Sequence, residues 1–196
     1  MAPVTLGLGQ PVPDALARAR VLDPSGGEHV LGEVWSDRDA LVVFARHFAC
    51  AGCADHLAEL RPRLGELDAL GVGAVLIGNG TADQLATFIA AQRLVGHPLA
   101  TFTDPTLAAY RAAELVRDRL GTIGPRALGN LAKLALRGRV NGRACGDLWQ
   151  QGGTLYVRRG GELGFVHRGA RVGDHAPVAD VVQLALAARA AEAGVA

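Results

Sequence analysis

The sequence predicts an α/β sandwich built on a mixed central sheet. Two short apolar runs, residues 40–46 and 71–78, are typical of strands that are buried on both faces. Leucines at helical spacing follow the first run, and an antiparallel hairpin followed by a helix closes the pattern. An alternation of strands and helices that ends in a hairpin indicates helices packed on both sides of a sheet.

The first half of the chain is expected to contain the centre of this sheet. Short strands and turns are predicted before residue 40, with PVPD and DPSGG as the turn sequences. The run ALVVFAR is too short for a helix and rich in β-branched residues, which favours a strand. A helix is expected directly after it, and GVGAVLIG predicts the next strand. The apolar face of that helix would be formed by Leu57, Leu60, Leu64 and Leu67.

The second half is expected to supply helices and the hairpin. Thr81 has the side chain of an N-cap at the start of an amphipathic helix. A further helix is predicted from Leu107 to Leu115, after an Asp-Pro turn. TLYV and LGFVH flank the turn RRGGE and predict an antiparallel hairpin at residues 154–167. A last helix is expected after Pro177, because proline is common at the first helical position.

Composition restricts the function classes. The chain has 196 residues, of which 49% are hydrophobic, and this suffices for one domain with a full core. The net charge of +1 gives no general attraction to nucleic acid or to a membrane surface. Three cysteines are too few for a secreted disulfide framework. Without a signal-peptide pattern or an apolar run of about 20 residues, the expected location is the cytoplasm.

We expect a single domain over residues 1–196. Residues 1–40 would form an N-terminal hairpin extension, residues 119–147 a helical insertion, and residues 188–196 a tail that frays. The insertion is basic, and this permits two interpretations: a lid that admits an anionic substrate, or a solvated helix at the sheet edge. It lacks the interleaved aromatic residues of nucleic-acid-binding segments. Its basic residues are Arg119, Arg126, Lys133, Arg137, Arg139 and Arg143.

The segment HFACAGCADH, residues 47–56, carries the clearest chemical signal. It places Cys50 and Cys53 where a buried strand is followed by a helix. Unpaired backbone N–H groups and the helix dipole stabilise a thiolate at such a position, and a thiolate is the nucleophile in disulfide exchange and peroxide reduction. A second thiol one turn later can close a disulfide with the first. The alternative is that both cysteines are small buried hydrophobic residues.

A metal site is the other alternative for this segment. Two thiolates and two imidazoles can hold a tetrahedral zinc ion, and His47, Cys50, Cys53 and His56 are evenly spaced. Against this, structural zinc sites usually take their ligand pairs from separate segments of the chain. We therefore expect no resident metal and no other cofactor, since no GxGxxG nucleotide motif follows a strand either.

Other candidate residues each have a functional and a structural interpretation. Arg46 can place a positive charge near the thiolate, or form an ordinary exposed salt bridge. His47 can act as a base or orient the thiolate, or be a structural residue beside the strand. Cys145 can be a resolving thiol or an incidental loop cysteine. The pair Asp174-His175 is interpreted first as a cap of the last helix and second as part of a site.

Motifs along residues 5–187 resemble the thioredoxin fold and its peroxiredoxin branch, the AhpC/TSA group. The leader LGLGQPVPDA and the segment ATFTDPTLAAYRAAEL are similar to segments of that group. The CxxC preceded by Arg46, the segment GDLWQQGGTLYV, His167 and the triplet Gly173-Asp174-His175 resemble the peroxiredoxin-like 2 proteins. The resemblance implies a thioredoxin-like, three-layer sandwich.

The resemblance also implies a function. It indicates a thiol-dependent oxidoreductase that uses the CxxC to reduce a small-molecule peroxide or a disulfide. One alignment makes Cys53 the peroxidatic residue, whereas alignment on thioredoxins makes Cys50 the exposed attacking thiol and Cys53 the resolving one. We favour Cys50, because the first sulfur of a CxxC that opens a helix is usually the exposed one. A thioredoxin system or a low-molecular-weight thiol would be the reductant, and a homodimer is an open alternative to a monomer. The competing hypothesis is a non-catalytic module that senses redox state or binds a partner.

One departure from the resembled pattern concerns Gly153. Thioredoxins carry a cis-proline before the corresponding strand, packed over the dithiol, and this chain has a glycine there. The glycine would leave the pocket open to a larger substrate. Alternatively, it would permit a tight entry into the strand.

Overall fold

The structure, a computed structural model, describes residues 8–142 and 145–193. Within these ranges a seven-stranded sheet has the order β2-β1-β5-β4-β3-β6-β7. The central strands β3, β4 and β5 are parallel, and the flanking strands pair antiparallel to them. The predicted α/β sandwich with a mixed sheet is confirmed. The strands are β1 Arg20–Leu22, β2 Glu28–Val30, β3 Asp39–Phe44, β4 Val72–Gly78, β5 Leu99–Thr103, β6 Gly153–Arg158 and β7 Glu162–Arg168.

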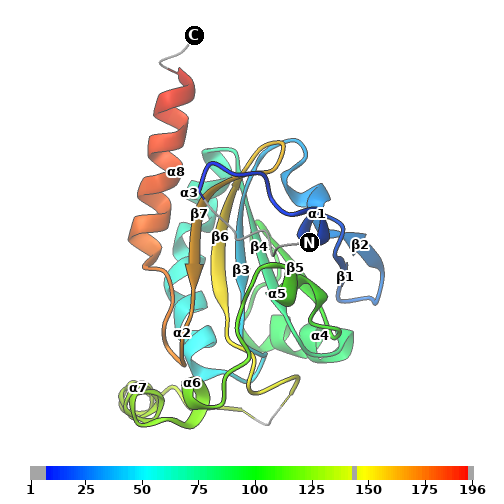
Figure 1. Ribbon diagram of the computed structural model, residues 1–196. Helices are drawn as coiled ribbons and strands as arrows, with labels where there is room; N and C mark the ends of the chain where they lie inside the picture. The colour runs from blue at the N-terminus through cyan, green and yellow to red at the C-terminus, as the bar shows by residue number, and fades with distance from the viewer. Residues whose placement is uncertain (1–7, 143–144, 194–196) are drawn as a thin grey trace.

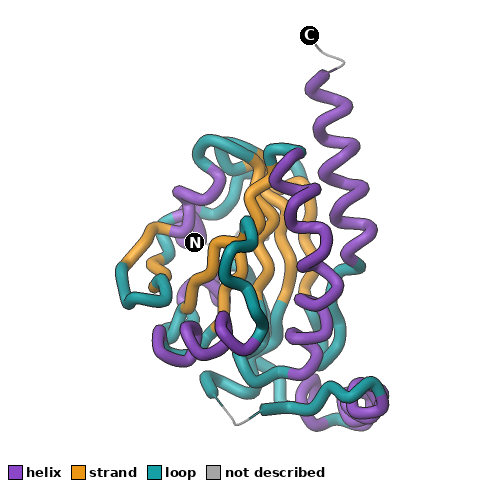
Figure 2. The backbone as a smooth tube through the Cα atoms, turned by 180° about the vertical axis from the view of Figure 1, so that it is seen from behind, coloured by secondary structure: helices purple, strands orange, loops and turns teal. Residues whose placement is uncertain are grey.

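Helices cover both faces of this sheet, as Figures 1 and 2 show from opposite sides. α8 runs along one side of the sheet and extends beyond its end, whereas α6 and α7 lie at the other end of the molecule (Figure 1). The helices are α1 Asp14–Ala17, η1 Leu31–Trp35, α2 Ala51–Leu60, η2 Arg61–Arg63, α3 Leu64–Ala69, α4 Ala82–Ala91, α5 Ala108–Ala112, α6 Leu120–Ile123, α7 Pro125–Leu136 and α8 Val178–Ala193.

Two hydrophobic cores explain why β3 is apolar throughout. Successive side chains of a strand point to opposite faces. Leu41 and Val43 therefore pack in the core under α2, α3, α4 and α8, whereas Val42 and Phe44 pack in the core with α1 and α5. Tyr110 of α5 is fully buried, and its hydroxyl donates to the carbonyls at the ends of β3 and β4. These two hydrogen bonds join the ends of β3 and β4, at the edge of the sheet where α2 begins.

Several predicted elements differ in extent from the structure. The leucine-spaced helix is divided into α2 and α3 by the 3₁₀ turn at Arg61–Arg63, which contains a proline. The helix expected from Leu107 to Leu115 is only α5, because Leu107 adopts a left-handed conformation with φ of 60°. Asp104 stabilises this irregular start by accepting the backbone N–H of Ala109 at 2.7 Å. β5 was not predicted, since its sequence LATFT shows no continuous apolar run.

Other elements agree with the sequence. Thr81 caps α4 in a capping box with Gln84. The last helix, α8, follows Pro177 as expected, and its residues Val178, Val181, Val182 and Ala185 are buried. The basic insertion contributes α6 and α7. Residues 1–7 of the predicted N-terminal extension, residues 143–144 of the insertion and residues 194–196 of the predicted tail lie outside the described residues. No helix of the described residues is both long and apolar enough to span a membrane.

Candidate functional site

The two cysteines lie where α2 begins, beyond the end of β3. Cys50 has the extended conformation of an N-cap residue, with φ of −75° and ψ of 117°, and its carbonyl accepts the N–H of Ala54. Cys53 lies in the first turn of the helix. Both are free thiols, and both residues are buried, with exposed fractions of 1% and 6%. The predicted position of the dithiol at a strand-to-helix junction is therefore observed, whereas the expectation that Cys50 is the exposed sulfur is wrong, because the residues around the start of α2 cover it.

The surroundings of Cys50 stabilise its thiolate. A hydrogen bond from the Cys53 thiol is the largest cause that lowers the pKa of Cys50, to about 6. The positive charge of Arg46 and the backbone N–H of Cys53 act in the same direction, and burial opposes them. With this lowered pKa, Cys50 is largely ionised at neutral pH, whereas an ordinary cysteine thiol, with a pKa of about 8.5, is mostly protonated.

Cys53 is placed to keep its proton. The hydrogen bond to Cys50, burial and the negative charge of Cys50 raise the pKa of Cys53 well above its ordinary value. The backbone N–H of Arg46 donates to Cys53 Sγ at 3.2 Å, which only partly offsets these causes. The geometry thus divides the pair into a thiolate at Cys50 and a protonated thiol at Cys53.

Arg46 is a buried cation whose nearest anionic group is a sulfur atom. Its exposed fraction is 2%, and its Nη1 lies 3.6 Å from Cys50 Sγ. No carboxylate of the described residues forms an ion pair with it. The expected alternative of an exposed salt bridge is therefore wrong. A buried charge needs compensation, and in this site the thiolate is the group that can supply it.

Neutral oxygen atoms hold the guanidinium in position. Arg46 Nε donates to Gln151 Oε1 at 2.9 Å, and its Nη2 donates to Thr122 Oγ1 at 2.6 Å and to the carbonyl of Leu148 at 2.7 Å. The backbone carbonyl of Arg46 accepts from Asn79 Nδ2. The sequence analysis missed Gln151, Thr122 and Asn79, and no local pattern indicates them, since each lies more than 30 positions away from Arg46.

A loop from the basic insertion covers the start of α2. The backbone N–H of Ala51 donates to Asn141 Oδ1 at 2.9 Å, and the N–H of Gly142 donates to the carbonyl of Ala49 at 3.0 Å. Asn141 thus supplies a capping oxygen that the Cys50 side chain does not supply. This contact was also missed, because an N-cap is normally sought immediately before the helix.

A mostly apolar cavity of about 550 Å³ gives access to the dithiol region. It lies between the start of α2, α4 and the loop after α7. Its wall includes Cys50, which is otherwise almost fully covered, and also Cys145. Burial raises the pKa of Cys145, so this thiol is protonated at neutral pH. Apolar residues of the wall are Phe48, Ala51, Ala54, Phe88 and Val140.

The histidines of this segment do not form a metal site with the cysteines. His47 is buried, and its Nδ1 has no hydrogen-bond partner. Burial and, secondly, the charge of Arg46 lower the pKa of His47 to about 4, so it is neutral at pH 7. His56 stacks on His175 instead, with ring centroids 4.7 Å apart. Within residues 8–142 and 145–193, no group of three or more His, Cys, Asp or Glu side chains is arranged to hold a metal ion.

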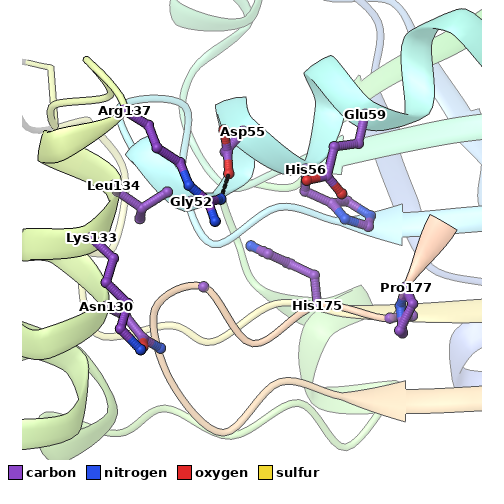
Figure 3. Close-up of a pocket in the computed structure, with 12 residues that line it drawn as sticks. Gly52, Asp55, His56, Glu59, Asn130, Lys133, Leu134, Arg137, His175 and Pro177 are labelled. Atoms are coloured by element: carbon purple, nitrogen blue, oxygen red, sulfur yellow. Dashed lines mark hydrogen bonds and ion pairs between the residues drawn. The ribbon is translucent and has the colours of Figure 1, made fainter.

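A second cavity, of about 250 Å³, lies on the side of α2 that carries His56 (Figure 3). His175 and Asp55 line it, and Asp55 forms an ion pair with Arg137, the residue after α7. The first interpretation of Asp174-His175 as a helix cap is wrong, because α8 begins only at Val178. The carboxylate of Asp174 accepts the N–H of Ala170 instead, which closes the loop before the helix.

Gly153 does not open the pocket. A Cβ atom at this position would lie 2.6 Å from a methyl group of Leu115 and 2.7 Å from the carbonyl of His167. The position is therefore tightly packed, which favours the interpretation of a tight strand entry over that of an enlarged substrate pocket.

The chain is similar to known proteins over most of its length. Residues 59–171 match the family described as AhpC/TSA antioxidant enzyme, a region that begins after both cysteines of the pair. The chain is 32% identical over 186 residues to the thioredoxin-like protein AAED1, chloroplastic, of Arabidopsis thaliana, covering 90% of this chain and 74% of that protein. It is also 32% identical over 189 residues to peroxiredoxin-like 2C of Mus musculus, covering 90% and 81%.

The solved structures extend the likeness to the fold. PrxQ from Xylella fastidiosa superimposes with a TM-score of 0.67 over 95% of this chain and 98% of its own, at 12% sequence identity. At this identity the likeness concerns the fold alone. It confirms the predicted thioredoxin-like, three-layer architecture.

Proposed function

Because this chain belongs to the AhpC/TSA antioxidant enzyme family, we propose that it is a thiol peroxidase in which Cys50 attacks the peroxide. The observation that carries the proposal is the contact of 3.6 Å between the buried Arg46 guanidinium and Cys50 Sγ. A cation at that position stabilises the thiolate before the reaction. It can also stabilise the negative charge that develops on the departing oxygen.

The proposed reaction has two steps. The Cys50 thiolate attacks one peroxide oxygen, the O–O bond breaks, and the leaving alkoxide or hydroxide takes a proton to become an alcohol or water. Cys50 is then a sulfenic acid. In the second step Cys53 attacks Cys50 Sγ, the S–O bond breaks, a disulfide forms and water leaves. Two electrons from an external thiol, a thioredoxin or a low-molecular-weight thiol, restore both thiols.

His47 has no assigned step in this reaction, and the protein is proposed to act in the cytoplasm. Because His47 is neutral at pH 7, it does not supply a positive charge to the thiolate. The reducing cytoplasm is the proposed setting, since a dithiol must be returned to thiols after each turnover.

Intact-mass measurement after alkylation tests the proposed function. The reduced protein is mixed with one equivalent of peroxide, alkylated and weighed. We expect the loss of two hydrogens and of two alkylation sites at Cys50 and Cys53. The Cys145→Ser variant is the matched control and retains this change, whereas Cys50→Ser and Cys53→Ser each lose it. Retention of the full disulfide signal in Cys50→Ser would contradict the assignment, and a protein unchanged by peroxide would favour the non-catalytic alternative.

The apolar cavity beside Cys50 favours an organic peroxide over hydrogen peroxide as the substrate. Aromatic rings of Phe48 and Phe88 and methyl groups of Ala51 and Ala54 line it. Burial of an apolar group stabilises binding by about 25 cal/mol for each Å² removed from water, and hydrogen peroxide has no such group. Disulfide substrates remain a second candidate, because the same thiolate attacks sulfur as well as oxygen.

A further inference from the structure

The second step of the proposed reaction requires a place for the proton of Cys53. In the reduced protein this thiol donates its hydrogen bond to the Cys50 thiolate. Once Cys50 has become a sulfenic acid, the anionic acceptor no longer exists. Cys53 must nevertheless lose its proton before or while it attacks, because the thiolate is the nucleophile. The hydroxide that leaves Cys50 is one destination for this proton, and a base on the other side of Cys53 would be a second one.

Neither of two other polar groups near Cys53 can serve as this acceptor. Arg46 has no acceptor site, and its backbone N–H is already donated to Cys53 Sγ. Tyr110 donates its hydroxyl to the carbonyls of Ala45 and Ile77, and burial raises its pKa well above the ordinary value. Tyr110 therefore stays protonated at neutral pH and offers no phenolate to accept the proton of Cys53.

A small cavity lies beside Cys53 and two imidazoles. Its volume is about 10 Å³, which is about the space of one water molecule, and its wall contains Cys53, His56 and His175. The rest of its wall is apolar, so a water in this cavity would lie between the Cys53 side chain and the two rings. The Nε2 atom of His175 is buried, has no hydrogen-bond partner and lies beside Gly52, which lines the cavity of about 250 Å³. Unpaired buried nitrogen atoms are costly, so an imidazole with such an atom in the wall of both cavities indicates a use.

The same two imidazoles also line the larger cavity of about 250 Å³ on the outer side (Figure 3). His56 comes from α2 and His175 from the segment before α8, and their rings stack at 24° between the two cavities. A neutral imidazole accepts a proton at one nitrogen and can release one from the other. The stacked pair thus lies between the buried thiol and solvent.

We propose that His175, with His56 stacked on it, accepts the proton of Cys53 through one water molecule during disulfide formation. This inference rests on the proposed function of the dithiol. The proton then leaves through the outer cavity, and the hydroxide released from Cys50 takes a proton from solvent, so charges and protons balance. During reduction by an external thiol, the released Cys53 thiolate regains a proton by the same route.

Burial lowers the pKa of His175 to about 4 and that of His56 to about 3, so both rings are neutral at pH 7. Such rings are weak bases, so the protonated ring is short-lived and passes its proton on to solvent. Oxidation of Cys50 removes the hydrogen bond and the negative charge that raise the pKa of Cys53, while the charge of Arg46 remains. Groups that face the two rings are Arg46, Asp55, Glu59, Lys133, Arg137, His167 and Asp174.

Single-turnover kinetics test this inference. The reduced protein is mixed with one equivalent of peroxide and quenched at successive times, once with a sulfenic-acid trap and once with an alkylating agent. Masses then give separately the rate of Cys50 oxidation and the rate of disulfide formation. In His175→Gln we expect disulfide formation to be at least about tenfold slower at pH 7, with Cys50 oxidation within about twofold of wild type. The unchanged first step shows that the variant is folded.

The pH profile separates proton transfer from a structural role. Between pH 6 and 8 the wild-type rate of disulfide formation is expected to be flat, whereas the rate in His175→Gln rises about tenfold for each pH unit, because hydroxide replaces the lost base. His56→Gln should show a smaller change in the same direction. His97→Gln, in the exposed loop after α4, is the matched control and keeps the wild-type profile.

Two results would overturn the inference. One is a His175→Gln variant with the wild-type rate and flat profile of disulfide formation. The other is a variant in which both steps slow equally, which indicates a general disturbance of the site. A wild-type protein that forms no sulfenic acid and no disulfide contradicts the proposed function itself, and the two failures are thereby distinguished.

Discussion

Arg46 Nη1 lies 3.6 Å from Cys50 Sγ in a site where no carboxylate of the described residues forms an ion pair with the guanidinium. A buried cation without a carboxylate is stabilised by an anion that forms next to it. The protein therefore favours the ionised form of Cys50 in its folded state. The guanidinium does not have to move for this, because Gln151 and Thr122 already hold it.

Replacement of Arg46 by glutamine is expected to raise the pKa of Cys50 above its value of about 6. The charge and one hydrogen bond to the thiolate are lost, and each lowers the pKa in the wild-type protein. The rate of alkylation as a function of pH measures the pKa. We expect the midpoint to rise by about one unit or more and the rate with peroxide to fall by about tenfold at pH 7. Arg46→Lys retains the charge and should lie between the two; an unshifted midpoint in Arg46→Gln would contradict the role of the cation.

Asn141 offers a test of the loop that covers the dithiol. Asn141→Ala removes the oxygen that accepts the N–H of Ala51, and we expect a loss of about 1 kcal/mol in the free energy of unfolding. Asn141→Asp keeps an accepting oxygen and restores most of that stability. Its negative charge lies at the start of α2 beside Cys50, so it should raise the pKa of Cys50. Urea unfolding and thiol titration measure the two effects, and a stability equal to wild type in Asn141→Ala would argue against the cap.

The size of the apolar cavity should control which peroxide reacts. Ala54→Leu adds three methylene-sized groups to a wall shared with Cys50. We expect kcat/KM for an aromatic hydroperoxide to fall by about tenfold, because the bulky apolar part no longer fits, while the value for hydrogen peroxide changes by less than about threefold. Ala58→Leu, on the same helix but not in the cavity wall, is the control. Equal losses for both peroxides would contradict an apolar substrate site.

Acid is expected to destabilise the protein through its buried histidines. Burial lowers the pKa values of His47, His56 and His175 to about 4, 3 and 4, from an ordinary value of 6.5. Between pH 6.5 and 4 the unfolded chain therefore binds protons that the folded chain does not, and stability falls as the pH falls through this range. Urea midpoints at pH 7 and pH 5, measured in Cys50→Ser to remove the thiol titration, check this. His56→Gln should show a smaller difference, whereas equal midpoints at both pH values would contradict the prediction.

The close approach of Gly78 to Phe48 gives a test of the cavity wall. A Cβ atom at Gly78 would overlap the ring of Phe48, which lines the apolar cavity. Gly78→Ala is therefore expected to cost about 1–3 kcal/mol of unfolding free energy. Gly65→Ala, in α3 with no atom near the added methyl group, should instead gain up to about 1 kcal/mol. Thermal or urea unfolding distinguishes the pair, and similar stabilities in both variants would contradict the overlap.

The sequence by itself determined the fold class and the position of the dithiol. Buried strands and amphipathic helices have periodic patterns within a few neighbouring residues, so β3, β4, the hairpin and α8 were predicted from local sequence. Local periodicity did not predict the extent of α5 or the presence of β5. Asp104 caps an irregular turn that shortens α5, and most side chains of β5 are partly exposed, so its sequence contains no continuous apolar run.

Only the tertiary structure decided how the dithiol is tuned. Gln151 and Thr122 bind Arg46 from 105 and 76 positions away, and Asn141 reaches Ala51 across 90 positions. His175 meets His56 in the same way, by a stacking contact between a loop and α2. Hydrogen bonds and ring contacts between distant segments have no period in the sequence. Their geometry exists only once the sheet has brought those segments to one edge. For this reason the sequence pointed to the cysteines and to the charge of Arg46, but not to the residues that hold them in position.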